Sequence, residues 1–187
     1  MKTVDLAYIA LFAAITAALG LVPAIPVGPV PITAQTLAVM LAGSVLGARR
    51  GFLALLLFLL LVAIGLPVLS GGRGGLAVFA GPSAGYLLAW PVGAFVVGLL
   101  TERLWQRYNL AWGVATNLVG GVLVIYLIGV PVLAAVAHLS PRAAIVAGVL
   151  PFLIGDLFKA VVAAGIAEQV RRSYPVITRP RRAVAAG

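Results

Sequence analysis

Long apolar runs, separated by short polar or Pro/Gly-rich segments, make up most of this chain. Runs of this kind predict membrane-spanning helices, and the breaks divide them into candidate spans. The six spans cover residues 5–22, 33–48, 51–66, 82–101, 110–128 and 151–170. The second and third are short, since about 16 residues of helix reach only about 24 Å across a bilayer core of about 30 Å. They are expected to meet at a turn formed by Ala48-Arg49-Arg50-Gly51. The pattern predicts an all-α polytopic membrane protein, with one six-helix domain over residues 1–175 and a basic cytoplasmic tail over 176–187.

The basic residues are distributed unevenly between the two ends of these spans. If the spans alternate from an inner N-terminus, two basic residues, Arg73 and Arg142, fall on the outer side. Ten fall on the inner side: Lys2, Arg49, Arg50, Arg103, Arg107, Arg171, Arg172, Arg179, Arg181 and Arg182. Short cytoplasmic loops carry the excess of Lys and Arg, so both termini are predicted to be cytoplasmic and the 1–2, 3–4 and 5–6 connections extracellular. The net charge of +9 therefore indicates topology and contact of the tail with lipid headgroups, not nucleic-acid binding. Docking of a soluble partner on the tail is the alternative.

The three outer connections are long and rich in Pro and Gly. Residues 22–32 contain four prolines, which exclude a helix and favour a stiff lid. Residues 67–83 contain five glycines around Arg73, so this loop either points backbone amides at a ligand or forms a flexible turn. Residues 129–150 hold His138, expected to be a solvated loop histidine, and an apolar run over 143–150. That run is too short to span a bilayer and is expected to lie at the interface or to re-enter.

Two charged residues, Asp156 and Lys159, lie inside the last predicted span. A charge at the bilayer centre costs about 2.5–3.5 kcal/mol on insertion scales, so such residues usually face a partner, a cavity or a ligand. The i,i+3 spacing places both on one helix face, with Asp156 about 8 Å from a helix start near Pro151. This depth favours a pocket that opens to one side of the membrane. A structural ion pair that stabilises the bundle is the alternative.

Few other polar residues lie within the spans. Thr33, Gln35 and Tyr86 lie at the same outer level as the charged pair and are predicted to converge with it. Asn117 lies nearer the inner side, where an interhelical hydrogen bond is expected. Thr36 is expected to bond the carbonyl four residues before it.

Small residues recur on one face of the first span, at Ala10, Ala14 and Ala18. This spacing lets another helix approach closely, which is a main source of helix association in lipid. The other helix belongs either to this chain or to a separate subunit. Packing within the chain is favoured by residue pattern alone, because Ala and Gly are abundant throughout.

Composition narrows the classes of function. The chain has no cysteine, one histidine and four acidic residues, which argues against an enzyme, a metal site or a bound cofactor. It also lacks the Gly-x-x-x-x-Gly-Lys-Ser/Thr nucleotide loop. Two classes remain: the substrate-capture subunit of an ATP-driven importer, and a self-sufficient proton-coupled carrier for a small organic acid or vitamin, with Asp156 as the relay. No inverted repeat is visible, which disfavours the carrier.

Six separate motifs follow one another over residues 5–170. They are Pro29-Val-Pro-Ile-Thr33, Gln35-Thr-Leu-Ala-Val39, Leu46-Gly-Ala-Arg-Arg-Gly51, Gly71-Gly-Arg-Gly-Gly75, Phe79-Ala-Gly-Pro-Ser-Ala-Gly-Tyr86 and Pro151-Phe-Leu-Ile-Gly-Asp-Leu-Phe-Lys159. Together they resemble BioY, the biotin-specific S component of energy-coupling-factor transporters. The resemblance implies a six-helix domain in a prokaryotic plasma membrane that captures biotin with high affinity from outside.

The resemblance also assigns roles to residues. It implies that Asp156 and Lys159 bind biotin and that the face of Ala10, Ala14 and Ala18 contacts a transmembrane coupling subunit, driven by two cytoplasmic ATPase subunits. Lys159 can supply a cation for the biotin carboxylate, and Asp156 can accept from the ureido N–H groups or hold Lys159 in place. The full set of candidate substrate-binding residues is Asp156, Lys159, Tyr86, Gln35, Thr33, Arg73, Gly74 and Gly75.

Overall fold

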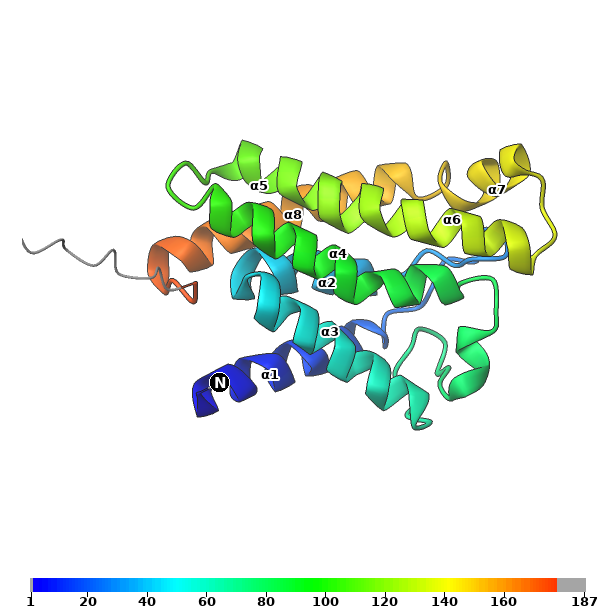
Figure 1. Cartoon of the computed structure of the whole chain (residues 1–187), viewed down its shortest axis with the longest axis horizontal. Coiled ribbons are helices and arrows are strands. Elements are labelled where there is room, and N and C mark those ends of the chain that lie inside the picture. Colours follow the sequence, from blue (N-terminus) through cyan, green and yellow to red (C-terminus); the bar gives the residue numbers. More distant parts are fainter. Residues whose placement is uncertain (1, 178–187) are drawn as a thin grey trace, which may run out of the picture.

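A bundle of helices accounts for most of the chain (Figure 1). The computed structural model describes residues 2–177. The helices, in chain order, are α1 (Thr3–Leu19), α2 (Gln35–Leu46), α3 (Ala48–Ala63), the 3₁₀ turn η1 (Leu76–Phe79), α4 (Ala84–Arg103), α5 (Leu110–Asn117), the π-helix η2 (Leu118–Val124), α6 (Ile125–Val136), α7 (Pro141–Gly148) and α8 (Leu153–Ser173). Within the described range the β pairing is confined to two isolated bridges, Ile25–Ile32 and Leu69–Arg73. The all-α prediction is confirmed.

The helix that follows α4 is longer than the sequence pattern predicts. Segments α5, η2 and α6 form one apolar helix of 27 residues, Leu110–Val136, which continues through Pro131. The predicted end at residue 128 and the predicted loop over 129–150 are therefore wrong. Proline is tolerated inside such a helix because neighbouring helices and local adjustments satisfy the freed backbone groups. The apolar run over 143–150 contributes to α7, which is bent by 49° from α8.

The connection between α2 and α3 is also shorter than predicted. A single residue, Gly47, separates the two helices, so Arg49 and Arg50 lie in the first turn of α3 and not in a loop. Gly47 has a φ of 83°, which glycine adopts without a side-chain penalty. The carboxylate of Glu102 accepts a 2.7 Å hydrogen bond from the backbone N–H of Ala48, and this bond caps the start of α3.

Close helix packing in this part of the bundle depends on glycine. A Cβ added to Gly98 of α4 would overlap the backbone of Gly47 and Ala48, and one added to Gly43 of α2 would overlap Val97 of α4. Helices α2, α3 and α4 therefore approach one another through positions without side chains, as membrane helices commonly do.

By length and composition, Ala84–Arg103 and Leu110–Val136 are long and apolar enough to cross a membrane, and the bent pair α7 and α8 forms a third candidate. Helices α1 and α2 are apolar but shorter. The N-terminus, the α4–α5 connection and the end of α8 lie at one end of the bundle, and the α3–α4 connection and α7 lie at the other (Figure 1).

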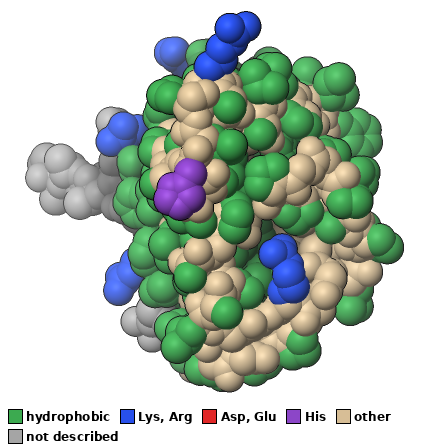
Figure 2. All heavy atoms as spheres, turned by 90° about the vertical axis from the view of Figure 1, so that its right-hand side faces the viewer, with side chains coloured by type: hydrophobic (Ala, Val, Ile, Leu, Met, Phe, Trp, Pro, Cys, Tyr) green, Lys and Arg blue, Asp and Glu red, His purple; other side chains and the backbone are tan. Residues whose placement is uncertain are grey.

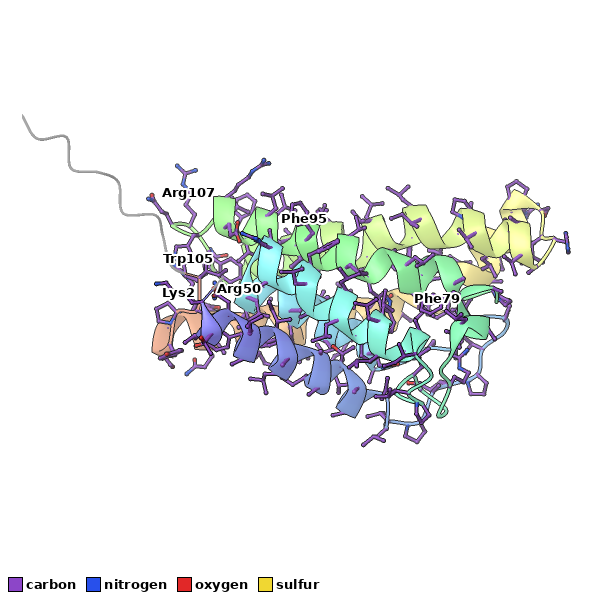
Figure 3. The ribbon with its side chains drawn as sticks, turned by 60° about the horizontal axis from the view of Figure 1, so that its bottom comes forward. Lys2, Arg50, Phe79, Phe95, Trp105 and Arg107 are labelled. Carbon is purple, nitrogen blue, oxygen red and sulfur yellow. The ribbon has the colours of Figure 1, made fainter. Side chains whose placement is uncertain are left out.

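Basic side chains gather at the first of these ends, where Lys2, Arg50 and Arg107 are labelled in Figure 3. Figure 2 looks onto the opposite end, where hydrophobic and uncharged groups dominate and only a few basic side chains are visible. The charge asymmetry expected from the sequence is therefore present between the two ends of the folded bundle. Of the predicted tail over 176–187, residues 178–187 lie outside the described range, and Val176 and Ile177 are buried against the bundle.

Candidate functional site

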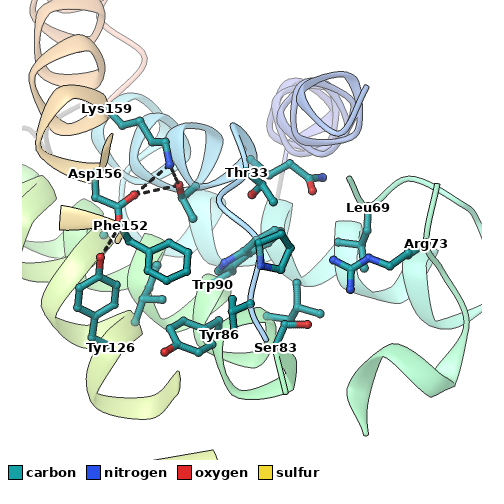
Figure 4. A pocket seen from close by; sticks show the side chains of 17 residues that line it. Thr33, Leu69, Arg73, Ser83, Tyr86, Trp90, Tyr126, Phe152, Asp156 and Lys159 are labelled. Carbon is teal, nitrogen blue, oxygen red and sulfur yellow. Dashed lines mark hydrogen bonds and ion pairs between the residues drawn. The ribbon is translucent and has the colours of Figure 1, made fainter. Parts of the chain in front are cut away.

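A cavity opens among the ends of α2, α4, α6 and α8, beneath the 1–2 and 3–4 connections (Figure 4). The empty space between its lining atoms, open solvent at the mouth included, is about 600 Å³. Val30, Pro31 and Thr33 line it from the first connection, and Leu69, Arg73 and Ser83 from the second. The Pro-rich segment expected to act as a lid therefore does contribute to the cavity wall.

The charged pair lies at one side of this cavity and is bonded to two further helices. The Lys159 Nζ donates to Asp156 Oδ1 over 3.0 Å and to Thr36 Oγ1 over 2.8 Å. The Tyr126 hydroxyl donates to Asp156 Oδ2 over 2.6 Å, and the Thr36 hydroxyl lies 3.5 Å from Asp156 Oδ1. Figure 4 shows Tyr126 of α6 approaching Asp156 and Lys159 of α8, and the hydrogen bonds add Thr36 of α2 to the cluster. Both carboxylate oxygens are thus hydrogen-bonded, as a buried anion requires.

The position of this cluster follows from local helix geometry. Asp156 lies in the first turn of α8, where the helix dipole favours a negative charge, and Lys159 follows one turn later on the same face. The Asp156 and Lys159 side chains are only 6% and 13% exposed. A pair this deeply buried depends on its partners, because removing one leaves the other without a counter-charge.

Aromatic rings form the walls between the charged cluster and the mouth. The ring of Tyr86 stacks on Phe152, with centroids 6.5 Å apart, and meets Tyr126 edge-on at 6.4 Å. The Tyr86 hydroxyl donates to the backbone carbonyl of Gly148 over 2.9 Å. Tyr86 therefore reaches the cavity as predicted, but it offers an apolar ring there while its hydroxyl holds α7.

Trp90 forms another part of the cavity wall and carries a hydrogen-bond donor that has no partner in the described residues. Its indole stacks on Phe58, with centroids 5.9 Å apart, and the residue lines the cavity at 4% exposure. No acceptor within residues 2–177 lies in hydrogen-bonding distance of its Nε1. A buried N–H without a partner is costly, so a ligand acceptor there would be favourable.

Gln35 lines the cavity, but its amide is occupied by the backbone. The Nε2 donates to the carbonyls of Thr16 (3.0 Å) and Val68 (3.1 Å), and the Oε1 accepts from Ser70 N–H (3.1 Å). With 1% exposure, Gln35 ties α1 and the 3–4 connection to the start of α2. It is better described as a residue that positions the cavity wall than as a ligand contact.

The glycine-rich connection contributes its arginine and not the two glycines. Arg73 lines the cavity at its open side and donates from Nε to the Ser70 carbonyl over 3.3 Å (Figure 4). Gly74 and Gly75 do not line it: a Cβ on Gly74 would overlap the Leu66 carbonyl, and Gly75 has a φ of 82°. These glycines serve close packing and a turn, so the structure does not bring them to the predicted ligand site.

The remaining sequence predictions have mixed outcomes. Asn117 does make interhelical hydrogen bonds, accepting from Ser44 over 2.9 Å and donating to the Ala160 carbonyl over 3.1 Å. His138 is exposed, as expected. The prediction for Thr36 is wrong, because its hydroxyl faces α8 and bonds the charged pair instead of its own helix.

The alanine face of α1 is turned away from the bundle. Ala10, Ala14 and Ala18 are all exposed, whereas Ala13 and Thr16 on the opposite face are buried. Packing of the alanine face within this chain, the interpretation favoured by residue pattern alone, is therefore wrong. The face is available to a separate partner.

Sequence reasoning missed Tyr126, Trp90 and Phe152 as cavity residues. Each is an aromatic residue in an apolar stretch and carries no sequence signal that separates it from an ordinary core residue. Tyr126 had one usable cue: a phenol in a membrane helix needs a hydrogen-bond partner. Within residues 2–177 no group of three or more His, Cys, Asp or Glu side chains is placed to hold a metal ion.

Comparison with known proteins places this architecture in one family. The BioY family model matches residues 1–176. The biotin transporter BioY of Rhizobium etli is 54% identical over 190 aligned residues, which cover 98% of this chain and 100% of that protein. The biotin transporter BioY of Rhodobacter capsulatus is 50% identical over 177 residues, with 89% and 93% of the two chains covered.

A solved structure agrees with these sequence matches. The crystal structure of the S-component for biotin from an ECF-type ABC transporter superposes with a TM-score of 0.86 at 34% identity, and covers 92% of this chain and 95% of that one. The relatives are transport proteins and not enzymes, which confirms the prediction that this protein is not an enzyme. The chain belongs to the BioY family.

Proposed function

We propose that this protein captures biotin with high affinity and is the substrate-specific subunit of an ATP-driven vitamin importer. The observation that carries the proposal is the cavity, with hydrogen-bonding charges at one side, aromatic walls, and a second cation at its mouth. Biotin combines a polar ureido edge, an apolar thioether body and a carboxylate on a flexible chain. The relatives that share the fold are named for biotin, which supports this ligand.

The geometry favours one orientation of biotin. The Lys159 ammonium is already bonded to Asp156 and Thr36, so this cluster presents donors and acceptors together and suits the ureido group. Arg73 is exposed at the mouth and makes one backbone bond from Nε, which leaves guanidinium donors for a carboxylate. We therefore assign the acid to Arg73 in place of Lys159, and the ureido group to Asp156 and Lys159.

Assembly and topology complete the proposal. The exposed face of Ala10, Ala14 and Ala18 would receive a transmembrane coupling subunit, which two cytoplasmic ATPase subunits would drive. The chain would cross a prokaryotic plasma membrane six times, with both termini cytoplasmic and the cavity opening outward. The basic end of the bundle supports this orientation.

Calorimetry on the purified protein tests both ligand and orientation. We expect biotin to bind without ATP at nanomolar affinity, about −12 kcal/mol, and riboflavin not to bind. Biotin amide should bind more weakly to the wild type. In Arg73→Gln the two ligands should bind equally, because the cation that distinguishes them is gone.

Four results would each contradict a part of the proposal. Absence of biotin binding, or equal binding of riboflavin, would overturn the ligand assignment. An undiminished preference for biotin over its amide in Arg73→Gln would overturn the orientation alone. Biotin uptake in cells that lack any coupling module, driven by a proton gradient, would instead support the self-sufficient carrier.

A further inference from the structure

A surface groove lies away from the cavity, along the seam between α3 and α4. Arg49, Phe52 and Leu53 line it from α3, and Val92 and Phe95 from α4. The rings of Phe52 and Phe95 meet edge-on with centroids 6.3 Å apart, so they form a fixed apolar wall. Figure 3 shows Phe95 on the side where these two helices run next to each other. None of the groove residues lines the biotin cavity.

The apolar surface continues from this groove toward the other end of the bundle. Leu56 and Leu60 of α3 and Leu88 of α4 are exposed large hydrophobic residues at helical spacing from the groove residues. From Arg49 to Leu60 the helix rises about 16 Å, close to one leaflet of a hydrocarbon core of about 30 Å. The strip therefore has the length of one acyl chain.

A cation lies at one end of this strip without a protein partner. Arg49 is exposed, and no carboxylate within residues 2–177 forms an ion pair with it. Its neighbour Arg50 is occupied, because it pairs with Asp5 (3.4 Å) and donates to the Val176 carbonyl (2.9 Å). The nearby Glu102 carboxylate accepts from the Ala48 amide. The planar guanidinium of Arg49 matches the geometry of a phosphate.

We propose that this seam is a binding site for one anionic phospholipid, with its phosphate on Arg49 and an acyl chain along Phe52, Phe95 and the leucines beyond. The basic end of the bundle favours a lipid with net negative charge over a zwitterionic one. A flexible acyl chain suits this surface better than a protein helix does. Bulky side chains line it, in contrast to the small residues of Ala10, Ala14 and Ala18 that permit close helix approach.

Native mass spectrometry of the purified protein with phosphatidylglycerol and phosphatidylcholine tests this inference. The wild type should retain phosphatidylglycerol in preference. Arg49→Gln should weaken phosphatidylglycerol binding about five- to tenfold and leave phosphatidylcholine unchanged, because one interfacial cation is lost. Phe95→Ala should weaken both lipids, because it removes the wall that holds the chain. Arg142 is an exposed arginine in α7 at the opposite end of the bundle, so Arg142→Gln is the matched control and should leave the binding of both lipids unchanged.

Three results would overturn the proposal. These are equal binding of the two lipids to the wild type, undiminished phosphatidylglycerol binding by Arg49→Gln, and an equal loss in Arg142→Gln. Displacement of the lipid by a coupling subunit or by a second copy of the chain, with Arg49→Gln abolishing that complex, would identify the seam as a protein interface and overturn it as well. Biotin affinity of each variant, measured alongside, verifies that the protein is folded.

Discussion

Removing Lys159 alone should destabilise the protein, whereas removing its whole cluster should leave the stability near the wild-type value. Biotin affinity measured on both variants then separates a ligand site from a structural ion pair. Lys159→Met keeps an apolar stem of similar length and deletes the ammonium. The Asp156 carboxylate then stays buried without its cation, and within residues 2–177 its remaining hydrogen-bond partners are the hydroxyls of Tyr126 and Thr36. Breaking a buried pair in this way typically costs 3–5 kcal/mol, so we expect a loss of about that size.

The loss can be read as a melting temperature. For a domain of this size each kcal/mol shifts the Tm by about 2–4 °C, so Lys159→Met should melt about 6–20 °C below the wild type. The triple variant Asp156→Leu, Lys159→Met and Tyr126→Phe removes the charges together with the hydroxyl bonded to them. Replacement of a buried pair by apolar residues of similar volume is often neutral, so its Tm should return to near the wild-type value.

Biotin binding should not recover with stability. If the cluster bonds the ureido group through charge-assisted hydrogen bonds, each contributes about 1.5–3 kcal/mol, or about a 10- to 150-fold change in affinity. Scanning calorimetry supplies the Tm and titration calorimetry the affinity on the same preparations. Near-normal biotin affinity in folded Lys159→Met, or in the triple variant, would refute the ligand role and leave a structural pair.

Four further variants test other parts of the site and the exposed face of α1. Tyr126→Phe removes the 2.6 Å hydrogen bond to the Asp156 carboxylate and should weaken biotin binding about 10-fold or more in calorimetry. Tyr86→Phe should weaken it less, because in the described structure the Tyr86 hydroxyl bonds only a backbone carbonyl. A larger loss in Tyr86→Phe than in Tyr126→Phe would contradict the geometry. Gln35→Ala leaves two carbonyls and one amide without their partner, each at a cost of about 1–3 kcal/mol, and should lower the Tm measurably; an unchanged Tm would show that Gln35 does not secure the loop. Ala14→Trp should preserve biotin binding by the isolated protein but abolish co-purification with a coupling subunit and uptake in cells, and loss of binding would place that face inside the bundle.

The sequence predicted the features that depend on the pattern of apolar residues and on the free-energy cost of placing a charge in lipid. Six apolar runs implied an all-helical membrane fold, and two charges in the last run implied a polar site because a lone charge in lipid is expensive. The sequence predicted the ends of the helices less accurately. The run after residue 110 continues to Val136 through Pro131, since tertiary packing, and not propensity alone, decides whether a membrane helix passes a proline.

The sequence alone determined which residues share a helix. Asp156 and Lys159, for example, lie one turn apart on α8 because three residues span nearly one helical turn. Which faces of different helices meet was decided only by the tertiary structure. Thr36 and Tyr126 bond the pair from α2 and α6, while Gln35, next to Thr36, points to backbone groups of the 3–4 connection. Adjacent side chains on a helix point about 100° apart, so the rotation of each helix about its own axis selects the side chain that faces the cavity. Close contacts at glycines and the π-helix before Tyr126 set that rotation. Those rotations arise from contacts between segments distant in the chain, which no local pattern records.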